Sequence, residues 1–189
     1  SSLMGSKPKP SSASVSTNAR SNSGVTKTKA PSFILGGPNC ELFFMRLQSL
    51  PTRSMRAGFF GENLRLTFNE SGVFESRWVK TIFTEAAKDS LWTKGFEGKE
   101  MCFPVAHGEG KFVMDGPMTK ATIALQYEPN VYPNNPNGSV HSIAGVFSGD
   151  KGQFFGVMPH PERAIEPFHF TRHGLIFFEN ILKNLSDKT

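Results

Sequence analysis

Between residues 64 and 158 the sequence repeats one pattern, in which short apolar segments are separated by turns rich in glycine, asparagine and proline. Segments of this length, rich in β-branched and aromatic residues, predict strands. They are LRLTF (64–68), VFESRWVKTIF (73–83), MCFPVA (101–106), KFVM (111–114) and TIALQYE (122–128). A further stretch, SIAGVFSGDKGQFFGVM, contains two apolar runs around a Gly-Asp-Lys-Gly turn and predicts a β-hairpin. This part of the chain is therefore expected to be rich in hairpins.

Helices are predicted on both sides of this region. SFILGG (32–37) predicts a strand that enters a tight turn, and the apolar spacing of NCELFFMRLQSL (39–50) predicts a helix that ends before Pro51. RHGLIFFENILKNL (172–185) predicts a second helix, whose apolar face holds Leu175, Phe178, Ile181, Leu182 and Leu185. Strand, glycine turn and helix begin an α/β unit, so the expected fold class is α/β with a hairpin-rich insert.

Residues 1–32 differ in composition from everything that follows. They are rich in serine, lysine and proline and nearly free of large apolar side chains. Such a segment buries too little apolar surface to offset its ordering entropy, so we expect a disordered tail or linker before a domain spanning 33–189. A basic, serine-rich and acid-free segment is also typical of an organelle transit peptide. The expected location is the cytoplasm, with organellar import as the alternative.

The net charge of +5 comes from this tail. Residues 1–32 carry 5 of the 21 basic residues and no acidic one, which leaves 16 basic and 16 acidic residues in the remainder. A basic face for nucleic acid is therefore not expected. No apolar run approaches the roughly 18 residues of a membrane span, so no membrane is expected as a partner. Two cysteines, Cys40 and Cys102, form no disulfide framework and fit a reducing compartment.

The stretch FGVMPHPERA (155–164) carries the clearest chemical signal. His160 stands between two prolines at the end of a predicted strand, where reacting groups of α/β sheets usually lie. Glu162 could accept a hydrogen bond from one imidazole nitrogen and leave the other nitrogen as a base. Such a pair has a function only beside a nucleophile.

Four motifs together resemble a known family. LTFNESGVFESRWV, FPVAHGEGKF, PNNPNGSVHSIAG and FGVMPHPERA, in this order, resemble the C-terminal half of the glutaminase component of phosphoribosylformylglycinamidine synthase, over about residues 33–185. The resemblance implies part of a class I glutamine amidotransferase domain with a flavodoxin-like sheet. It also implies that a cysteine attacks the amide of glutamine, with His160 as its base and Glu162 as the group that orients the base.

The resemblance further implies the partners of this domain. Glutamine would be the substrate, and the ammonia released would pass to a synthetase subunit or domain that uses ATP and magnesium to form an amidine in purine biosynthesis. No cofactor and no metal is expected in the glutaminase-like domain itself.

The position of the nucleophile is disturbed in this sequence. The resembled family has a Gly-x-Cys elbow, and an alignment without gaps from Gly36 places Pro38 at the nucleophile position. A shift of two residues places Cys40 there, but it puts Leu42 where the strained elbow needs glycine. It also puts Glu41 beside the sulfur, where a carboxylate disfavours the thiolate. Cys40 is the candidate nucleophile, with a buried or turn cysteine as the alternative.

The other histidines and cysteine of interest are expected to have mainly structural roles. The motif His107-Gly108-Glu109-Gly110 lacks the spacing of a phosphate loop, and by resemblance it lies near the active site. The alternative is a strand-joining turn with a hydrogen-bonded histidine. Cys102 alternates with core residues of a predicted strand, so packing in the core is expected for it. His169 and His173 have helical i, i+4 spacing but no third ligand nearby, so no metal site is predicted.

Three hypotheses follow for the chain as a whole. The first is an active glutaminase that uses Cys40, His160 and Glu162. The second is an inactive glutaminase-like module that docks on a synthetase. The third is a piece of a longer protein, which is favoured by the abrupt change near residue 33 from the serine-rich tail to the family motifs. The glycine-rich oxyanion loop of the resembled family is not found before residue 33, and loss of one oxyanion donor typically costs about 10²–10³ in rate.

Overall fold

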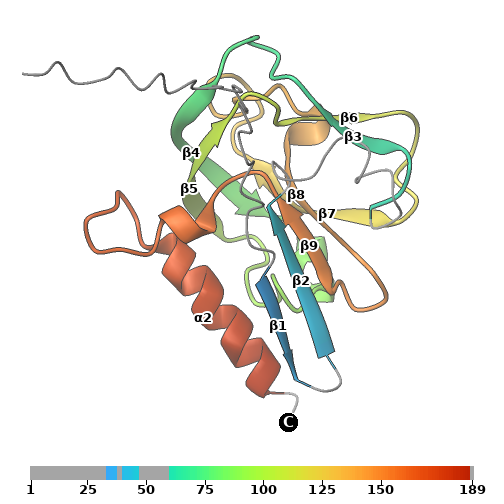
Figure 1. Cartoon of the computed structure of the whole chain (residues 1–189), viewed down its shortest axis with the longest axis vertical. Coiled ribbons are helices and arrows are strands. Elements are labelled where there is room, and N and C mark those ends of the chain that lie inside the picture. The colour runs from blue at the N-terminus through green and yellow to red at the C-terminus, as the bar shows by residue number, and fades with distance from the viewer. Residues whose placement is uncertain (1–32, 38–39, 47–59, 188–189) are drawn as a thin grey trace, which may run out of the picture.

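The fold is built on a seven-stranded sheet (Figure 1). The computed structural model describes residues 33–37, 40–46 and 60–187, with side chains from Phe60 onward. The strands lie in the order β1 (Phe33–Gly37), β2 (Cys40–Arg46), β9 (Phe154–Val157), β8 (Ile143–Ser148), β7 (Ala121–Tyr127), β4 (Glu75–Phe83) and β5 (Glu100–His107). Strands β2 and β9 are parallel, and all other neighbours in this sheet are antiparallel. A separate antiparallel pair joins β3 (Leu64–Thr67) and β6 (Lys111–Met114).

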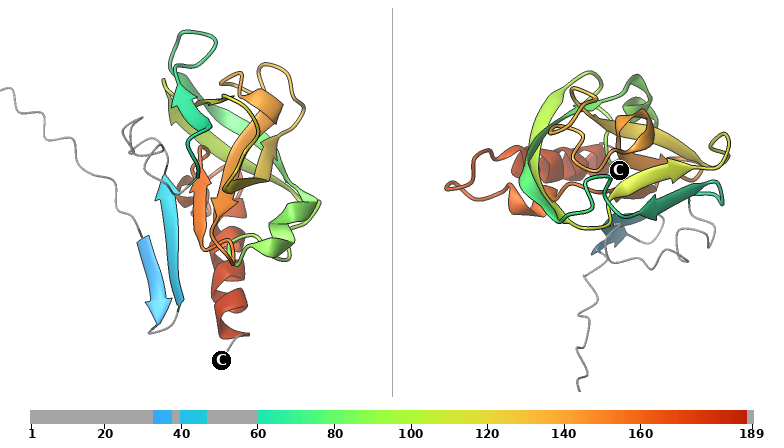
Figure 2. Two further views of the ribbon diagram at one scale, coloured as in Figure 1. Left: turned by 90° about the vertical axis from the view of Figure 1, so that its right-hand side faces the viewer. Right: turned by 90° about the horizontal axis from the view of Figure 1, so that it is seen from above.

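One long helix, α2 (His173–Ser186), packs against the large sheet (Figures 1 and 2). Three short 3₁₀ turns complete the described elements: η2 (Glu85–Asp89), η3 (Val140–Ser142) and η4 (Pro161–Arg163). The ring of Phe177 on α2 lies 5.9 Å from the ring of Phe155 on β9 and 6.4 Å from that of Phe103 on β5. Burial of aromatic surface between helix and sheet is therefore a main source of stability here.

The sheet curls so that the segment after the inner strand β9 reaches the edge strand β5. Strand β5 is an edge strand, and β9 is separated from it by β8, β7 and β4 in the strand order. Even so, the backbone N–H of His160, three residues after β9, donates to the carbonyl of Pro104 on β5 at 2.8 Å. This closure brings the segment after β9 to the end of β5. Between Phe60 and Asp187, and in the two strands before them, no helix is long and apolar enough to cross a membrane.

The structure confirms most of the predicted elements. The segments between 64 and 158 form β3 to β9, including the antiparallel β8–β9 hairpin. The C-terminal helix also forms, but the side of the helix that is buried differs from the predicted apolar face. Phe177 and Ile181 are buried in the core, whereas Leu182 is 57% exposed. The aromatic layer of the sheet accepts the ring of Phe177, and that contact sets the rotation of the helix.

The predicted helix over 39–50 is wrong for the part that the structure describes. Cys40 to Arg46 form strand β2, which pairs with β1 on one side and with β9 on the other. Pairing with β9 supplies backbone partners at that edge, and neighbouring phenylalanines favour a strand. Residues 1–32, Pro38 and residues 47–50 lie outside the described part of the chain. The disordered tail and the domain boundary at residue 33 stay predictions.

Candidate active site

His160 and Glu162 form the hydrogen-bonded pair that the sequence predicts. The Nδ1 atom of His160 lies 2.8 Å from Oε1 of Glu162. The His160 ring is fully buried, and the Glu162 side chain is 31% exposed. The other ring nitrogen, Nε2, has no hydrogen-bond partner among the described residues. A carboxylate on Nδ1 fixes the ring and leaves Nε2 as the atom that can accept a proton.

The turn that carries this pair is supported from the helix that follows. Turn η4 begins with Pro161, and the backbone N–H of Gly174 in the first turn of α2 donates to the carbonyl of Ala164 at 2.9 Å. A methyl group on Gly174 would collide with the carbonyl oxygen of Pro161. The close approach therefore requires glycine, and it holds η4 against α2.

A second polar cluster lies at the end of β5. His107 ends β5, is fully buried, and has its Nε2 3.5 Å from the amide nitrogen of Asn137. Asn137, also fully buried, donates to the carbonyl of Gly110 at 2.6 Å. Because the asparagine nitrogen is a donor, a hydrogen bond along this 3.5 Å contact uses Nε2 of His107 as the acceptor and requires the ring proton on Nδ1.

A buried asparagine ties the 107–110 turn to the loop before β4. Asn69 donates through Nδ2 to the carbonyl of His107 at 2.8 Å and to that of Val73 at 2.9 Å. Its Oδ1 accepts the backbone N–H of Gly110 at 3.0 Å. A single amide thus satisfies three backbone groups and fixes the position of the turn.

The environment of His107 keeps its ring neutral. Burial, and after it the charge that His160 carries when it is protonated, lowers the pKa of His107 from 6.5 to about 4. Within the described residues, His107 Nδ1 has no hydrogen-bond partner. The two histidines are thus coupled electrostatically, and a charge on one opposes a charge on the other.

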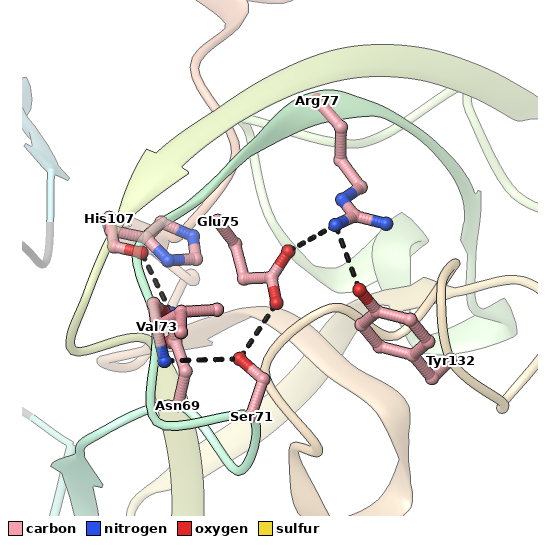
Figure 3. A network of polar contacts seen from close by, with 7 residues as sticks. All are labelled: Asn69, Ser71, Val73, Glu75, Arg77, His107 and Tyr132. Carbon is pink, nitrogen blue, oxygen red and sulfur yellow. Dashed lines mark hydrogen bonds and ion pairs between the residues drawn. The ribbon is translucent and has the colours of Figure 1, made fainter.

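An ion pair extends from this cluster to the surface (Figure 3). Glu75 pairs with His107 in the β4–β5 register and is 1% exposed. Its carboxylate lies 2.5 Å from Nη2 of Arg77 and accepts the hydroxyl of Ser71 at 2.7 Å. The same Arg77 nitrogen donates to the hydroxyl of Tyr132 at 3.0 Å. This arrangement joins the loops around β4 and β7 on the side of His107.

The two cysteines lie on different strands, and neither lies where the sequence predicts it to lie. Cys40 is the first residue of β2, whereas Arg46, at the other end of that strand, pairs with Val157 just before the His160 turn. Six residues of strand span about 20 Å. Cys102 is half-buried on the outer face of β5, so its predicted core packing is wrong; its neighbours Met101 and Phe103 fill the core instead. Burial raises the pKa of the Cys102 thiol.

The remaining predicted residues take structural roles in the described region. The helix begins only at His173, so the helical spacing expected for His169 and His173 is wrong. His173 accepts the backbone N–H of Cys102, and His169 accepts that of Glu166. In the described part of the chain no group of three or more His, Cys, Asp or Glu is placed to hold a metal ion. Glu109 is exposed on the 107–110 turn.

Three contributors were missed at the sequence level: Asn69, Asn137 and Gly174. The asparagines stand in the stretches NESG and PNNPNG, where turn chemistry explains them equally well. Gly174 follows the helix start, and only its contact with Pro161 reveals its role.

Comparisons with known proteins agree on one family. The profile of the CobB/CobQ-like glutamine amidotransferase domain matches residues 10–174. Phosphoribosylformylglycinamidine synthase subunit PurQ from Treponema denticola is 38% identical over 124 residues, covering 57% of this chain and 44% of that protein. The solved structure of PurLQS from Thermotoga maritima superposes with a TM-score of 0.54 at 37% identity, covering 64% of this chain and 52% of the solved chain.

The chain thus spans about half the length of these two relatives. The fold is a mixed α/β arrangement with a curled, largely antiparallel sheet that resembles the solved relative. With a family profile that covers most of the sequence, the chain belongs to the CobB/CobQ-like glutamine amidotransferase domain family, and it is similar to the glutaminase component of phosphoribosylformylglycinamidine synthase.

Proposed function

We propose that this chain acts in the glutaminase component of a phosphoribosylformylglycinamidine synthase. Glutamine would be hydrolysed to glutamate, and the ammonia would serve amidine formation on a synthetase partner that uses ATP and magnesium. The observation that carries the proposal is the His160–Glu162 pair, with 2.8 Å between Nδ1 and Oε1 and a buried Nε2 left open for a proton. No cofactor is required by this domain in the proposal.

In the proposed reaction each residue has one role. A thiol would attack the carboxamide carbon of glutamine and give its proton to His160 Nε2, which returns it to the departing ammonia. Water then hydrolyses the thioester with His160 again as the base. Glu162 would hold the ring and stabilise its transient positive charge. Cys40 remains the candidate for the thiol.

A second function is favoured by the β2 register. Because Arg46 and not Cys40 lies beside the end of β9, the sequence candidate for the nucleophile is about 20 Å along the strand from the His160 end. A glutaminase-like module without thiol chemistry, which docks on a synthetase, accounts for that separation. In this case the His160–Glu162 pair would serve the structure of η4.

One set of assays separates the two functions. Ammonia release from glutamine is measured for the chain together with its synthetase partner, and for the variants His160→Gln, Glu162→Gln and Cys40→Ala. The glutaminase proposal expects His160→Gln to reduce the rate by about 10²–10⁴, and Cys40→Ala to abolish it. Labelling by an electrophilic glutamine analogue should fall on Cys40.

The docking alternative expects a different pattern. Partner binding would persist in all variants, with no glutamine-dependent ammonia release and no labelling of Cys40. A normal rate in His160→Gln would overturn the role proposed for the pair, and a normal rate in Cys40→Ala would remove that cysteine as the nucleophile.

A further inference from the structure

The 107–110 turn contains two glycines that differ in the space around them. A methyl group on Gly110 would overlap the amide nitrogen of Asn137 and the ring of His107, at 2.5 Å from Nδ1. A methyl group on Gly108 would meet only Phe74 Cδ2, at 4.0 Å. Neither glycine is among the residues with positive φ. Glycine is therefore required at 110 because the His107 ring and the Asn137 amide occupy the space of a side chain.

The packing around Gly110 leaves His107 little freedom. Asn137 is held by its 2.6 Å bond to the Gly110 carbonyl and approaches His107 Nε2 at 3.5 Å. Asn69 holds the backbone on both sides of the turn through the His107 carbonyl and the Gly110 N–H. Two fully or nearly fully buried amides thus determine where the ring lies, which is more than a strand-joining turn needs.

His107 lies on the strand that holds the backbone of the candidate base. Both belong to the place where the curled sheet closes, since the backbone N–H of His160 binds Pro104, three residues before His107 on β5. Both rings are fully buried. Beside His160 lies Glu162 on η4. On the side of His107 lie Glu75, its partner residue on β4, and the hydroxyl of Tyr127, which is 3.4 Å from the Asn137 amide nitrogen.

We propose that His107, fixed by Gly110 and Asn137, is a positioning residue for His160. A neutral imidazole at this place fills the closure of the sheet without adding a charge that would oppose proton uptake by the candidate base. His107 would act on His160 electrostatically and through strand β5, whose Pro104 carbonyl binds the His160 backbone N–H. The catalytic significance of this positioning rests on the proposed glutaminase function. The coupling between the two histidines does not depend on that function.

The test compares two variants that add the same methyl group. Histidine ring nitrogens of the full chain are labelled with ¹⁵N, and their shifts are followed from pH 4 to 8 in the wild type, Gly110→Ala and Gly108→Ala. We expect Gly110→Ala to alter the tautomer of His107 and to move the titration midpoint of His160 by about half a unit or more. Gly108→Ala should leave both unchanged. A His160 titration that stays unchanged in folded Gly110→Ala would overturn the proposal.

A second variant serves if Gly110→Ala does not fold. Asn137→Ala removes the amide without crowding and should replace the single His107 tautomer by a mixture, again with a shift of the His160 midpoint. Asn134→Ala, whose side chain makes no hydrogen bond within the described residues, is the matched control. Retention of the wild-type His107 tautomer and His160 midpoint in Asn137→Ala would contradict the proposal.

Activity is a separate readout. If the chain with its synthetase partner releases ammonia, Gly110→Ala should lower kcat at least tenfold relative to Gly108→Ala, because a displaced base misaligns the proton transfer. Equal kcat values for the two variants would overturn the positioning role. If the wild type itself is inactive with its partner, the proposed function fails, whereas the ring titrations still decide whether His107 positions His160.

Discussion

The polar side chains on β4, β5 and the loops before β4 and after β7 form an inner and an outer cluster, and only the outer cluster reaches the surface. The inner cluster consists of His107, Asn69 and Asn137, each of which is at most 3% exposed. The outer cluster consists of Glu75, Arg77 and Tyr132. Glu75 is buried like the inner residues, at 1% exposed, whereas the Arg77 side chain is 34% exposed and Tyr132 is 61% exposed. Only the outer cluster contains an ion pair within the described residues.

This difference follows from the cost of burying charge. An ion taken out of water loses several kcal/mol of solvation, so a closed site favours neutral amides that satisfy the backbone. In the outer cluster the charge of the buried Glu75 carboxylate is balanced by Arg77, whose partly exposed guanidinium keeps part of its hydration. Protonation or loss of a partner in the inner cluster should therefore lower the stability of the fold strongly. The same changes in the outer cluster should lower it weakly, by an amount that depends on salt.

The largest effect is expected from protonation of His107. Its pKa in the folded protein, about 4, lies below the ordinary value of 6.5. Between these values the unfolded chain binds more protons than the folded one, so stability falls as the pH decreases from about 6.5 to about 4. The loss attributable to His107 should reach about 3 kcal/mol. Urea denaturation of the wild type and His107→Gln at several pH values measures it.

Carboxylates also titrate in this range, so the difference between the two proteins is the relevant quantity. Exposed His141→Asn is the control, because asparagine tolerates the φ of 50° at that residue. If the wild type and His107→Gln lose stability in parallel, His107 is not held neutral by the inner cluster.

Loss of the Asn69 amide should have the next largest effect. Asn69→Ala leaves the His107 carbonyl and the Gly110 N–H buried without their partner. We expect a loss of about 2 kcal/mol in the free energy of unfolding. Asn63→Ala is the control, because its single bond to the Pro117 carbonyl lies in an exposed setting and should cost less than 1 kcal/mol. Equal losses in the two variants would mean that burial does not set the cost.

The sequence predicts the parts of this site whose contacts are local. His160 and Glu162 are two residues apart, and one short turn brings their side chains together. The strands between 64 and 158 are predicted because glycine-rich turns separate segments of strand length. Both inferences need only the conformation of neighbouring residues.

The inner cluster depends on contacts that no local pattern contains. Asn69 reaches a carbonyl 38 positions away, and Asn137 reaches one 27 positions away. Their partners are fixed by the β4–β5 register and by the closure of the sheet. The wrong helix over 40–46 has the same origin, because β2 pairs with a strand near the other end of the chain. Apolar spacing alone cannot report such a partner.

The smallest loss of stability is expected from a change in the outer cluster. This change also tests most directly whether the two clusters differ. Arg77→Met keeps the aliphatic stem but removes the charged partner of the buried Glu75. The carboxylate keeps the Ser71 hydroxyl, and water can reach it through the space that the guanidinium leaves, which limits the cost. We expect a loss of about 1 kcal/mol that shrinks as NaCl is raised from 0.05 to about 1 M, because salt screens an ion pair whose guanidinium is partly exposed. Arg163→Met, on an exposed side chain with no ion pair inside the described region, should change stability little. A salt-independent loss in Arg77→Met as large as that of Asn69→Ala would show that the guanidinium is effectively buried. The two clusters would then form one closed network, in which Glu75 links the surface to His107.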